Sequence, residues 1–306
     1  PCVQALYRVK CYAPGDQWNA EVIERKGVEP GGEPVVVRIG RDRLPSCFVQ
    51  GTLASDQVGD SQGLMVFDRG RGEQWVKLQA GQPFACGPLP PGHYALQLQA
   101  TPSGGQRRAT PLVVPLGEHE LLPGQRLDLG ELRLPTLGEL AVELADARGQ
   151  PVDKTLLRFA MIEAIQGGTS VEIVAGRGST RVAPGRYLPS TGPNGRQVEH
   201  APIEVRAGER TTVKLRFADV VRRQVRYDMS AIGVPARCYA TFRKDGVPLH
   251  RVWFNFWRDE PATVDHAFTP GNWELAFELA DGHLQSFPFV VTEDNSAPVI
   301  HVRPER

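Results

Sequence analysis

The chain has 306 residues; Gly (32) and Pro (26) make up about a fifth of them, and 41% are hydrophobic. So many helix-breaking residues exclude a helical bundle, and the apolar fraction excludes a disordered chain. No apolar run reaches the roughly 18 to 20 residues that a membrane helix needs, so no membrane span is predicted. The 35 basic and 35 acidic residues cancel, so net charge does not point to nucleic acid or an anionic membrane as a partner.

A short motif recurs along the chain, in which a Pro-Gly pair is followed within three residues by an aromatic residue. Its copies are Pro14-Gly15, Pro91-Gly92, Pro184-Gly185 and Pro270-Gly271. The glycines lie 77, 93 and 86 residues apart, a spacing typical of small β-sandwich domains. Proline presets its own φ and glycine accepts a positive φ, so each pair predicts a type II turn from which the aromatic residue enters a strand.

Alternating apolar residues predict the strands around these turns. Tyr94, Leu96 and Leu98 share one face after the second turn, as do Trp273, Leu275 and Phe277 after the fourth. Opening strands are predicted at 48–53, 139–144 and 225–229, and closing strands around 35–39, 127–129, 213–217 and 299–301. The stretch 152–166 is compatible with either a strand or a short helix.

The repeated order of turn, strand and closing strand predicts the domain organisation. We expect all-β, tandem immunoglobulin-like or transthyretin-like antiparallel β-sandwich domains at 45–134, 135–218 and 219–306. A partial repeat at 1–44 would supply closing strands, either as part of a longer array or to complete another sheet. A change in the phase of alternation is expected near Ala218-Asp219, where one repeat runs into the next.

The segments PLPPGHYALQLQA, VAPGRYLPSTGPNG and FTPGNWELAFELADG resemble the carboxypeptidase regulatory-like, or transthyretin-like, β-sandwich repeats of bacterial extracytoplasmic proteins. The resemblance implies a periplasmic, secreted or cell-surface location and a role as a spacer, binding or accessory module. Related collagen-adhesin B-type repeats often contain a Lys to Asn isopeptide bond. No Lys, Asn and acidic set recurs at equivalent positions in this chain, so that bond is not expected.

One segment, Gly59-Asp60-Ser61-Gln62-Gly63, matches the G-x-S-x-G pattern of serine hydrolases. All seven histidines lie at position 93 or later, whereas the chymotrypsin order places the triad histidine before the serine. A strand-like run succeeds the motif in place of the helix of an α/β-hydrolase elbow, so the sequence predicts a polar loop there. No histidine spacing indicates a metal site, and neither a cofactor nor an enzyme activity is predicted. The alternative is an accessory region of an enzyme whose catalytic domain lies elsewhere.

The five cysteines do not follow the spacing of a structural zinc site. Cys47 and Cys86 are 39 positions apart within one predicted repeat, and a disulfide closing such a loop would stabilise the fold by roughly 4 kcal/mol. Two buried free thiols are the equal alternative.

The last repeat contains an aromatic strand in which Trp253, Asn255 and Trp257 share one face. Such a face could stack against a sugar ring, or it could pack under a loop, against the previous domain or in a dimer contact. The leading prediction is therefore a non-catalytic spacer or protein-interaction array whose partner is another protein or a neighbouring domain. The alternative is a carbohydrate-binding module centred on Trp253 and Trp257, with a glycan as partner.

Overall fold

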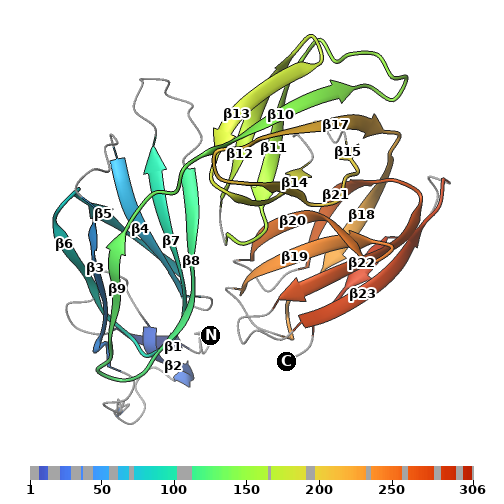
Figure 1. The fold of residues 1–306 in the computed structure, drawn as a ribbon. Coiled ribbons are helices and arrows are strands. Elements are labelled where there is room, and N and C mark those ends of the chain that lie inside the picture. The colour runs from blue at the N-terminus through green and yellow to red at the C-terminus, as the bar shows by residue number, and fades with distance from the viewer. Residues whose placement is uncertain are drawn as a thin grey trace. The chain divides into compact units, whose positions relative to one another are not determined.

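The computed structural model describes residues 7–12, 21–28, 36, 44–54, 61–68, 72–101, 112–164, 167–190, 197–231, 236–256, 261–278, 284–293 and 299–304. These residues form 24 β-strands and no helix (Figure 1), which confirms the predicted all-β class. The stretch 152–166, where strand and helix were both open, contains strand β11 (Lys154–Met161). The chain divides into two compact units, Pro1–Leu98 with Leu116–Leu134, and Gln99–Pro115 with Pro135–Arg306.

The first strands along the chain are β1 (Tyr7–Tyr12) and β2 (Glu21–Val28), which pair with each other antiparallel. The predicted closing strand at 35–39 lies outside the described residues, apart from Val36. Residues 47–132 form two sheets with the strand orders β6-β3-β9 and β5-β4-β7-β8. Their strands are β3 (Cys47–Leu53), β4 (Ser61–Asp68), β5 (Gly72–Leu78), β6 (Pro83–Leu89), β7 (Gly92–Thr101), β8 (Leu112–Leu121) and β9 (Arg126–Leu132).

Residues 138–218 form eight hydrogen-bonded strands in the order β15-β17-β10-β13-β12-β11-β14-β16. A single residue pair, Val174 with Arg177, joins β12 to β13, so the sheet divides there into two halves. Besides β11, its strands are β10 (Gly138–Ala145), β12 (Gly168–Val174), β13 (Arg177–Val182), β14 (Gly185–Ser190), β15 (Gln197–Val198), β16 (Ile203–Val205) and β17 (Arg210–Ala218).

Residues 221–302 form two further sheets, with the orders β21-β18-β24 and β20-β19-β22-β23. Their strands are β18 (Val221–Tyr227), β19 (Ala236–Lys244), β20 (Val247–Phe256), β21 (Ala262–Phe268), β22 (Gly271–Glu278), β23 (Leu284–Val291) and β24 (Ile300–Val302).

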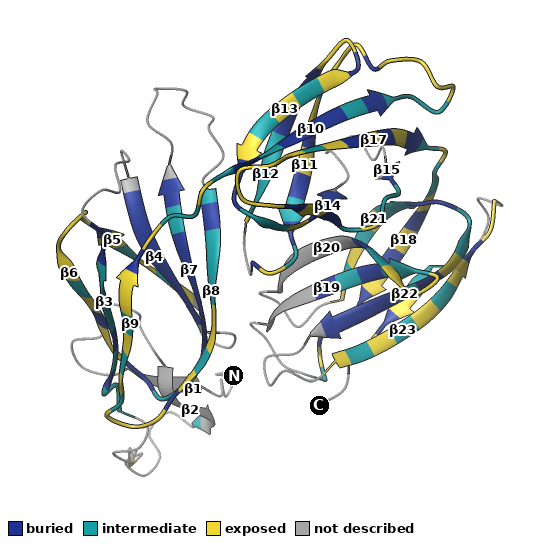
Figure 2. Ribbon diagram, viewed as in Figure 1, coloured by how far each residue is buried: buried dark blue, intermediate teal, exposed yellow. Residues whose placement is uncertain are grey.

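Unit 2 contains two separate hydrophobic cores, and each is enclosed by strands from two facing sheets or half-sheets. The first core joins Leu140 and Leu215 on one half-sheet to Phe159 and Ile173 on the other. The second joins residues of β18, β21 and β24 to residues of β19, β22 and β23, including Tyr227, Phe268, Phe242, Trp273 and Val291. Buried and exposed residues alternate along these strands (Figure 2), which is the β-sandwich arrangement that the sequence predicts.

The strand that opens each group of sheets pairs parallel with the strand that closes it. This holds for β3 with β9, for β10 with β17, and for β18 with β24. The other strand pairs of these groups whose register the structure describes are antiparallel. Alternation of side chains has the same period in parallel and antiparallel strands, so the sequence did not distinguish this pairing.

The predicted change of phase near Ala218-Asp219 is wrong. The buried positions are odd-numbered in β17 and remain odd-numbered in β18, as Phe217 and Val225 illustrate. The connecting residues Asp219 and Val220 therefore preserve the parity, and one continuous segment supplies strands to two cores without exchanging its inner and outer faces.

Candidate functional site

Each described copy of the Pro-Gly motif makes the same buried hydrogen bond. The hydroxyl of Tyr94 donates to the carbonyl of Pro90 at 2.6 Å, and that of Tyr187 donates to Ala183 at 2.7 Å. In the last copy the indole Nε1 of Trp273 donates to the carbonyl of Thr269 at 2.8 Å. All three bonds span four residues, as in the tyrosine corner of Greek-key sandwiches, so the motif anchors the start of β7, β14 and β22.

The glycines of these copies do not adopt the predicted type II turn. Gly92, Gly185 and Gly271 have φ values of +155°, +153° and +142°, whereas the glycine of a type II turn has φ near +80°. Each glycine is also the first residue of its strand. Glycine is required because the chain enters the strand through a positive φ region that side chains avoid, and the expectation of a type II turn is wrong.

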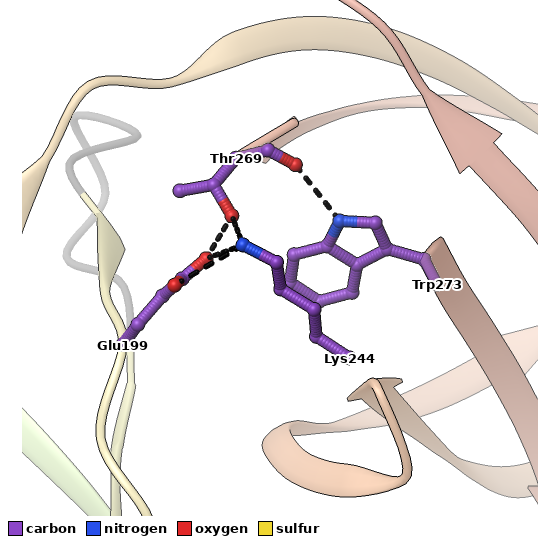
Figure 3. A network of polar contacts seen from close by, with 4 residues as sticks. All are labelled: Glu199, Lys244, Thr269 and Trp273. Atoms are coloured by element: carbon purple, nitrogen blue, oxygen red, sulfur yellow. Dashed lines mark hydrogen bonds and ion pairs between the residues drawn. The ribbon is translucent and has the colours of Figure 1, made fainter. Parts of the chain in front are cut away.

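The last copy of the motif is part of a polar cluster that we call the junction cluster, formed by Glu199, Lys244, Thr269 and Trp273 (Figure 3). The Nζ of Lys244 lies 2.9 Å and 3.2 Å from the two carboxylate oxygens of Glu199 and 2.6 Å from Oγ1 of Thr269. The Thr269 hydroxyl in turn donates to Glu199. The Lys244 side chain is 19% exposed and that of Glu199 30%, so this ion pair is shielded from water more than a surface pair.

Gly271 makes room for the lysine in this cluster. A Cβ atom added at Gly271 would lie 2.8 Å from Cε of Lys244, which is closer than real Cβ contacts. The Nζ of Lys244 also lies 5.9 Å from the centroid of the Trp273 ring, within the range of a cation–π interaction. Gly271, Lys244 and Trp273 therefore pack together as one group.

The junction cluster links the two cores of unit 2. Glu199 comes directly after Val198, which is buried in the first core, whereas Lys244 lies two residues after Phe242 and contacts Trp273, both in the second core. The three donor hydrogens of the ammonium group face carboxylate and hydroxyl oxygens, so the cluster is a satisfied ion pair. Chemically it can fix two cores relative to each other.

A second partly buried titratable group packs against the core of residues 221–302. The Nε2 of His266 is 2.8 Å from the hydroxyl of Tyr227, and the imidazole ring packs 5.0 Å from the Phe242 ring and 5.9 Å from the Phe268 ring. Burial lowers the pKa of His266 to about 4, against a smaller opposing effect of Asp265. The histidine is therefore a neutral packing residue at physiological pH.

The part of the chain that the structure describes contains no group of three His, Cys, Asp or Glu side chains placed to hold a metal ion. No helix able to cross a membrane is found among the described residues. Of the hydrolase-like motif, Gly59 and Asp60 lie outside the described residues. Ser61, Gln62 and Gly63 are the first residues of strand β4, and Gln62 is buried, so the prediction of a polar loop is wrong for these three residues. The run that follows them is a strand, as expected.

Of the two alternatives for Cys47 and Cys86, the disulfide is absent, and both residues are buried free thiols. Cys86 pairs with Val49 across β3 and β6, whereas Cys47 pairs with Leu89 beyond a bulge, so the two cysteines are not opposite each other. Diagonal neighbours in a sheet are about 7 to 8 Å apart, beyond the reach of a disulfide. Cys47 donates to the carbonyl of Leu122 and Cys86 to Oε1 of Gln74, both at 3.0 Å, and burial raises the pKa of Cys86 to about 12.

The structure describes only part of the aromatic strand that the sequence offers as a sugar-binding face. Trp253 and Asn255 lie in β20, where their backbones pair with Tyr239 and Arg237, but their side chains lie outside the described part of the structure, as does all of Trp257. Pro14 and Gly15 of the first motif copy also lie outside it. Carbohydrate binding by this strand therefore stays a prediction from sequence.

Sequence reasoning missed Glu199 and Lys244. One signal was available, because Lys244 occupies the same parity in β19 as the buried Ala240 and Phe242 and pairs with the buried Trp273. A lysine at an inward position of an alternating strand predicts a partner carboxylate. The identity of that partner, 45 residues earlier, is not contained in any local pattern.

No protein-family model matches the chain, and a search of curated proteins also finds no match. Among solved structures the chain is similar to the Bacillus anthracis TIE protein (14% identity, 84% of this chain and 50% of that one, TM-score 0.23). It is also similar to a streptococcal ancillary pilin (11%, 84% and 97%, TM-score 0.23) and to the minor pilin GBS52 of Streptococcus agalactiae (11%, 56% and 95%, TM-score 0.30). The chain thus spans half the length of the first of these, and at such TM-scores the similarities carry no argument about function.

Proposed function

We propose that this chain is a non-catalytic structural array of an extracytoplasmic protein, in which tandem β-sandwich repeats hold a neighbouring domain or protein partner at a distance. The repeats of this proposal are bounded near residues 45, 135 and 219. Its main support is the parallel pairing of the opening and closing strands.

Parallel pairing determines where the chain enters and leaves a repeat. In the repeat of residues 135–218 the chain enters at the amino end of β10 and leaves at the carboxyl end of β17, and these strands are parallel neighbours. The entry and exit points are therefore separated by a strand length, about 26 Å for the eight residues of β10. A repeat with this geometry contributes length to an array, which is what a spacer requires.

The same geometry resists tension along the chain. Seven residue pairs, from Glu139 with Arg210 to Ala145 with Arg216, join β10 to β17 in register. A force pulling the two ends apart slides these strands past each other and loads their hydrogen bonds together. A force applied at one end of the pair would open the same bonds in succession. Pulling along the array therefore meets the stronger of the two geometries.

Single-molecule pulling on the full chain tests this proposal. Azide-bearing residues introduced at positions 139 and 216 would load the β10–β17 pair in shear, whereas azides at 139 and 210 would peel the same pair open from one end. We expect the first arrangement to unfold at a force several-fold higher than the second. Equal unfolding forces in the two arrangements would contradict a role in bearing tension and would remove the main support for a spacer.

A further inference from the structure

The outer face of the half-sheet β13-β10-β17 displays cations from two strands on either side of a central acidic strand. We call it the cationic face. In register across the three strands, Arg181, Glu139 and Arg210 form one row, and Arg177, Glu143 and Lys214 form another. Arg216 extends β17 beyond the second row, opposite Ala145. The exposed positions of β13 and β17 can be seen in Figure 2.

The two carboxylates of this face do not neutralise it. Glu143 lies between Arg177 at 3.8 Å and Lys214 at 3.9 Å, and Glu139 lies 3.6 Å from Arg210. Five cations against two carboxylates leave a net charge of +3 on a face of three strands, although the chain as a whole is neutral. The side chains of Arg177, Arg210 and Lys214 are 81%, 64% and 85% exposed, so their charges face solvent.

A row of small residues separates the two charged rows. Ser179, Ala141 and Thr212 are in register there; Ala141 is buried, and Ser179 and Thr212 are exposed. Between the two charged rows the surface is therefore formed by small side chains, with the hydroxyl groups of Ser179 and Thr212 on either side of Ala141. The arginines at its sides lie about 10 Å apart, two strand spacings, and guanidinium groups bind carboxylates in a bidentate geometry.

We propose that the cationic face binds a linear anionic polysaccharide that carries carboxylate groups. In an extended chain, alternate sugars can present their carboxylates to the arginines of β13 and β17, so that no carboxylate lies over Glu139 or Glu143, and the sugar hydroxyls meet the hydroxyls of Ser179 and Thr212. Nucleic acid fits less well, because duplex DNA presents charge too densely to avoid the central glutamates. None of the exposed residues of this face is aromatic, so it also lacks a platform for base stacking. The choice of a polysaccharide rests on the extracytoplasmic location in the proposed function.

Binding of polygalacturonate to the full chain at low ionic strength tests the proposal, with neutral dextran and duplex DNA measured in parallel. Replacing two cations, Arg181→Gln with Arg210→Gln, should weaken polygalacturonate binding about tenfold or more, because two charge-assisted contacts are lost. Replacing the carboxylates, Glu139→Gln with Glu143→Gln, should instead tighten binding, because the net charge of the face increases. Added salt should weaken binding in every case.

The matched control removes two exposed cations elsewhere, Lys77→Gln with Arg133→Gln, and should leave affinity nearly unchanged. The proposal would be overturned by no binding of polygalacturonate, by equal weakening in the control pair, or by weaker binding after removal of the two glutamates. Tighter binding of duplex DNA than of polygalacturonate would also overturn it in favour of nucleic acid. None of these outcomes alters the unfolding forces of the pulling experiment, so the spacer role is tested separately.

Discussion

The ammonium group of Lys244 lies 2.9 Å from a carboxylate oxygen of Glu199, and this ion pair connects two cores that have no residue in common. The contribution of this ion pair to the free energy of unfolding depends on how far its side chains are shielded from water. Exposed ion pairs contribute about 0 to 1 kcal/mol, whereas removing one partner of a fully buried pair costs about 3 to 5 kcal/mol. With both side chains less than a third exposed, the pair lies between these limits.

We therefore expect a double-mutant cycle of Glu199→Gln and Lys244→Met to give a coupling free energy of about 1 to 2 kcal/mol, measured by urea unfolding. The matched control is the pair Arg133 and Glu131, which approaches to 2.6 Å but is more than half exposed on both sides. Its cycle should give a clearly smaller coupling. Equal couplings in the two cycles would mean that the junction cluster does not join the cores energetically.

The position of Lys244 also makes a prediction for Gly271. Gly271→Ala places a Cβ against the lysine stem and should displace the ammonium group from Glu199. Its cost to the free energy of unfolding should therefore shrink in a Lys244→Ala background, which removes both the lysine stem and the ammonium group. Gly149→Ala is the control, because Gly149 has a positive φ of +82° with no neighbour within 4 Å. Its cost should be the same in both backgrounds, and an undiminished cost of Gly271→Ala would contradict the packing described.

The hydrogen bonds of the two anchoring tyrosines predict that removing only the hydroxyl group lowers stability, although the buried ring is kept. Tyr94→Phe and Tyr187→Phe keep the buried rings but leave the carbonyls of Pro90 and Ala183 without these donors. Each substitution should lower the free energy of unfolding by about 1 to 2 kcal/mol, the cost of losing a buried hydrogen bond. Thermal or urea unfolding measures it, and wild-type stability in both variants would show that the hydroxyls do not anchor the strands.

His266 predicts how stability depends on pH. Its pKa is about 4 in the folded state, against 6.5 for an unperturbed histidine, so between these values the unfolded chain binds more protons. Stability should therefore be complete above pH 6.5 and should fall as the pH is lowered toward 4, by at most about 3 kcal/mol. His266→Gln should flatten the pH dependence over this range, whereas His93→Gln, at a side chain 74% exposed, should leave it unchanged. An identical pH profile in wild type and His266→Gln would exclude this histidine as the cause.

The two buried cysteines predict a labelling pattern. In the folded protein Cys47 and Cys86 should resist a thiol-alkylating reagent, because both are buried and the raised pKa of Cys86 suppresses its thiolate. In denaturant without reductant both should be alkylated fully, as peptide mass spectrometry would show. If alkylation in denaturant required a reductant, the two residues would be joined by a disulfide after all.

The positions of individual strands could be predicted from the sequence, because they depend on residues that are close together in the chain. The Pro-Gly motifs correctly marked the starts of β7, β14 and β22, and alternation located β10, β17 and β18 within a few residues. The type II turn was mispredicted because glycine tolerates several positive φ regions, and the sequence does not say which one the adjoining strand imposes.

The pairing and register of strands that are far apart in the chain could not be predicted from the sequence. The parallel pairing of β10 with β17 and the register that builds the cationic face join residues about 70 positions apart. Arg181 and Arg210 are unremarkable residues of two separate alternating strands until Glu139 is placed between them. The free thiols illustrate the same limit, since a bulge that offsets Cys47 from Cys86 leaves no trace in their spacing.

The pairing of first strand with last also governs how such a chain acquires its structure. The half-sheet that contains β10 is incomplete until β17 has been synthesised, some 70 residues later, and closing a loop of that length is slow compared with forming a hairpin. Each group of sheets must therefore remain open until its final strand emerges, with its apolar strands exposed in the meantime. A nascent chain of this design acquires its cores one after another from the amino end, and the interval before each closure is when it most needs protection from aggregation.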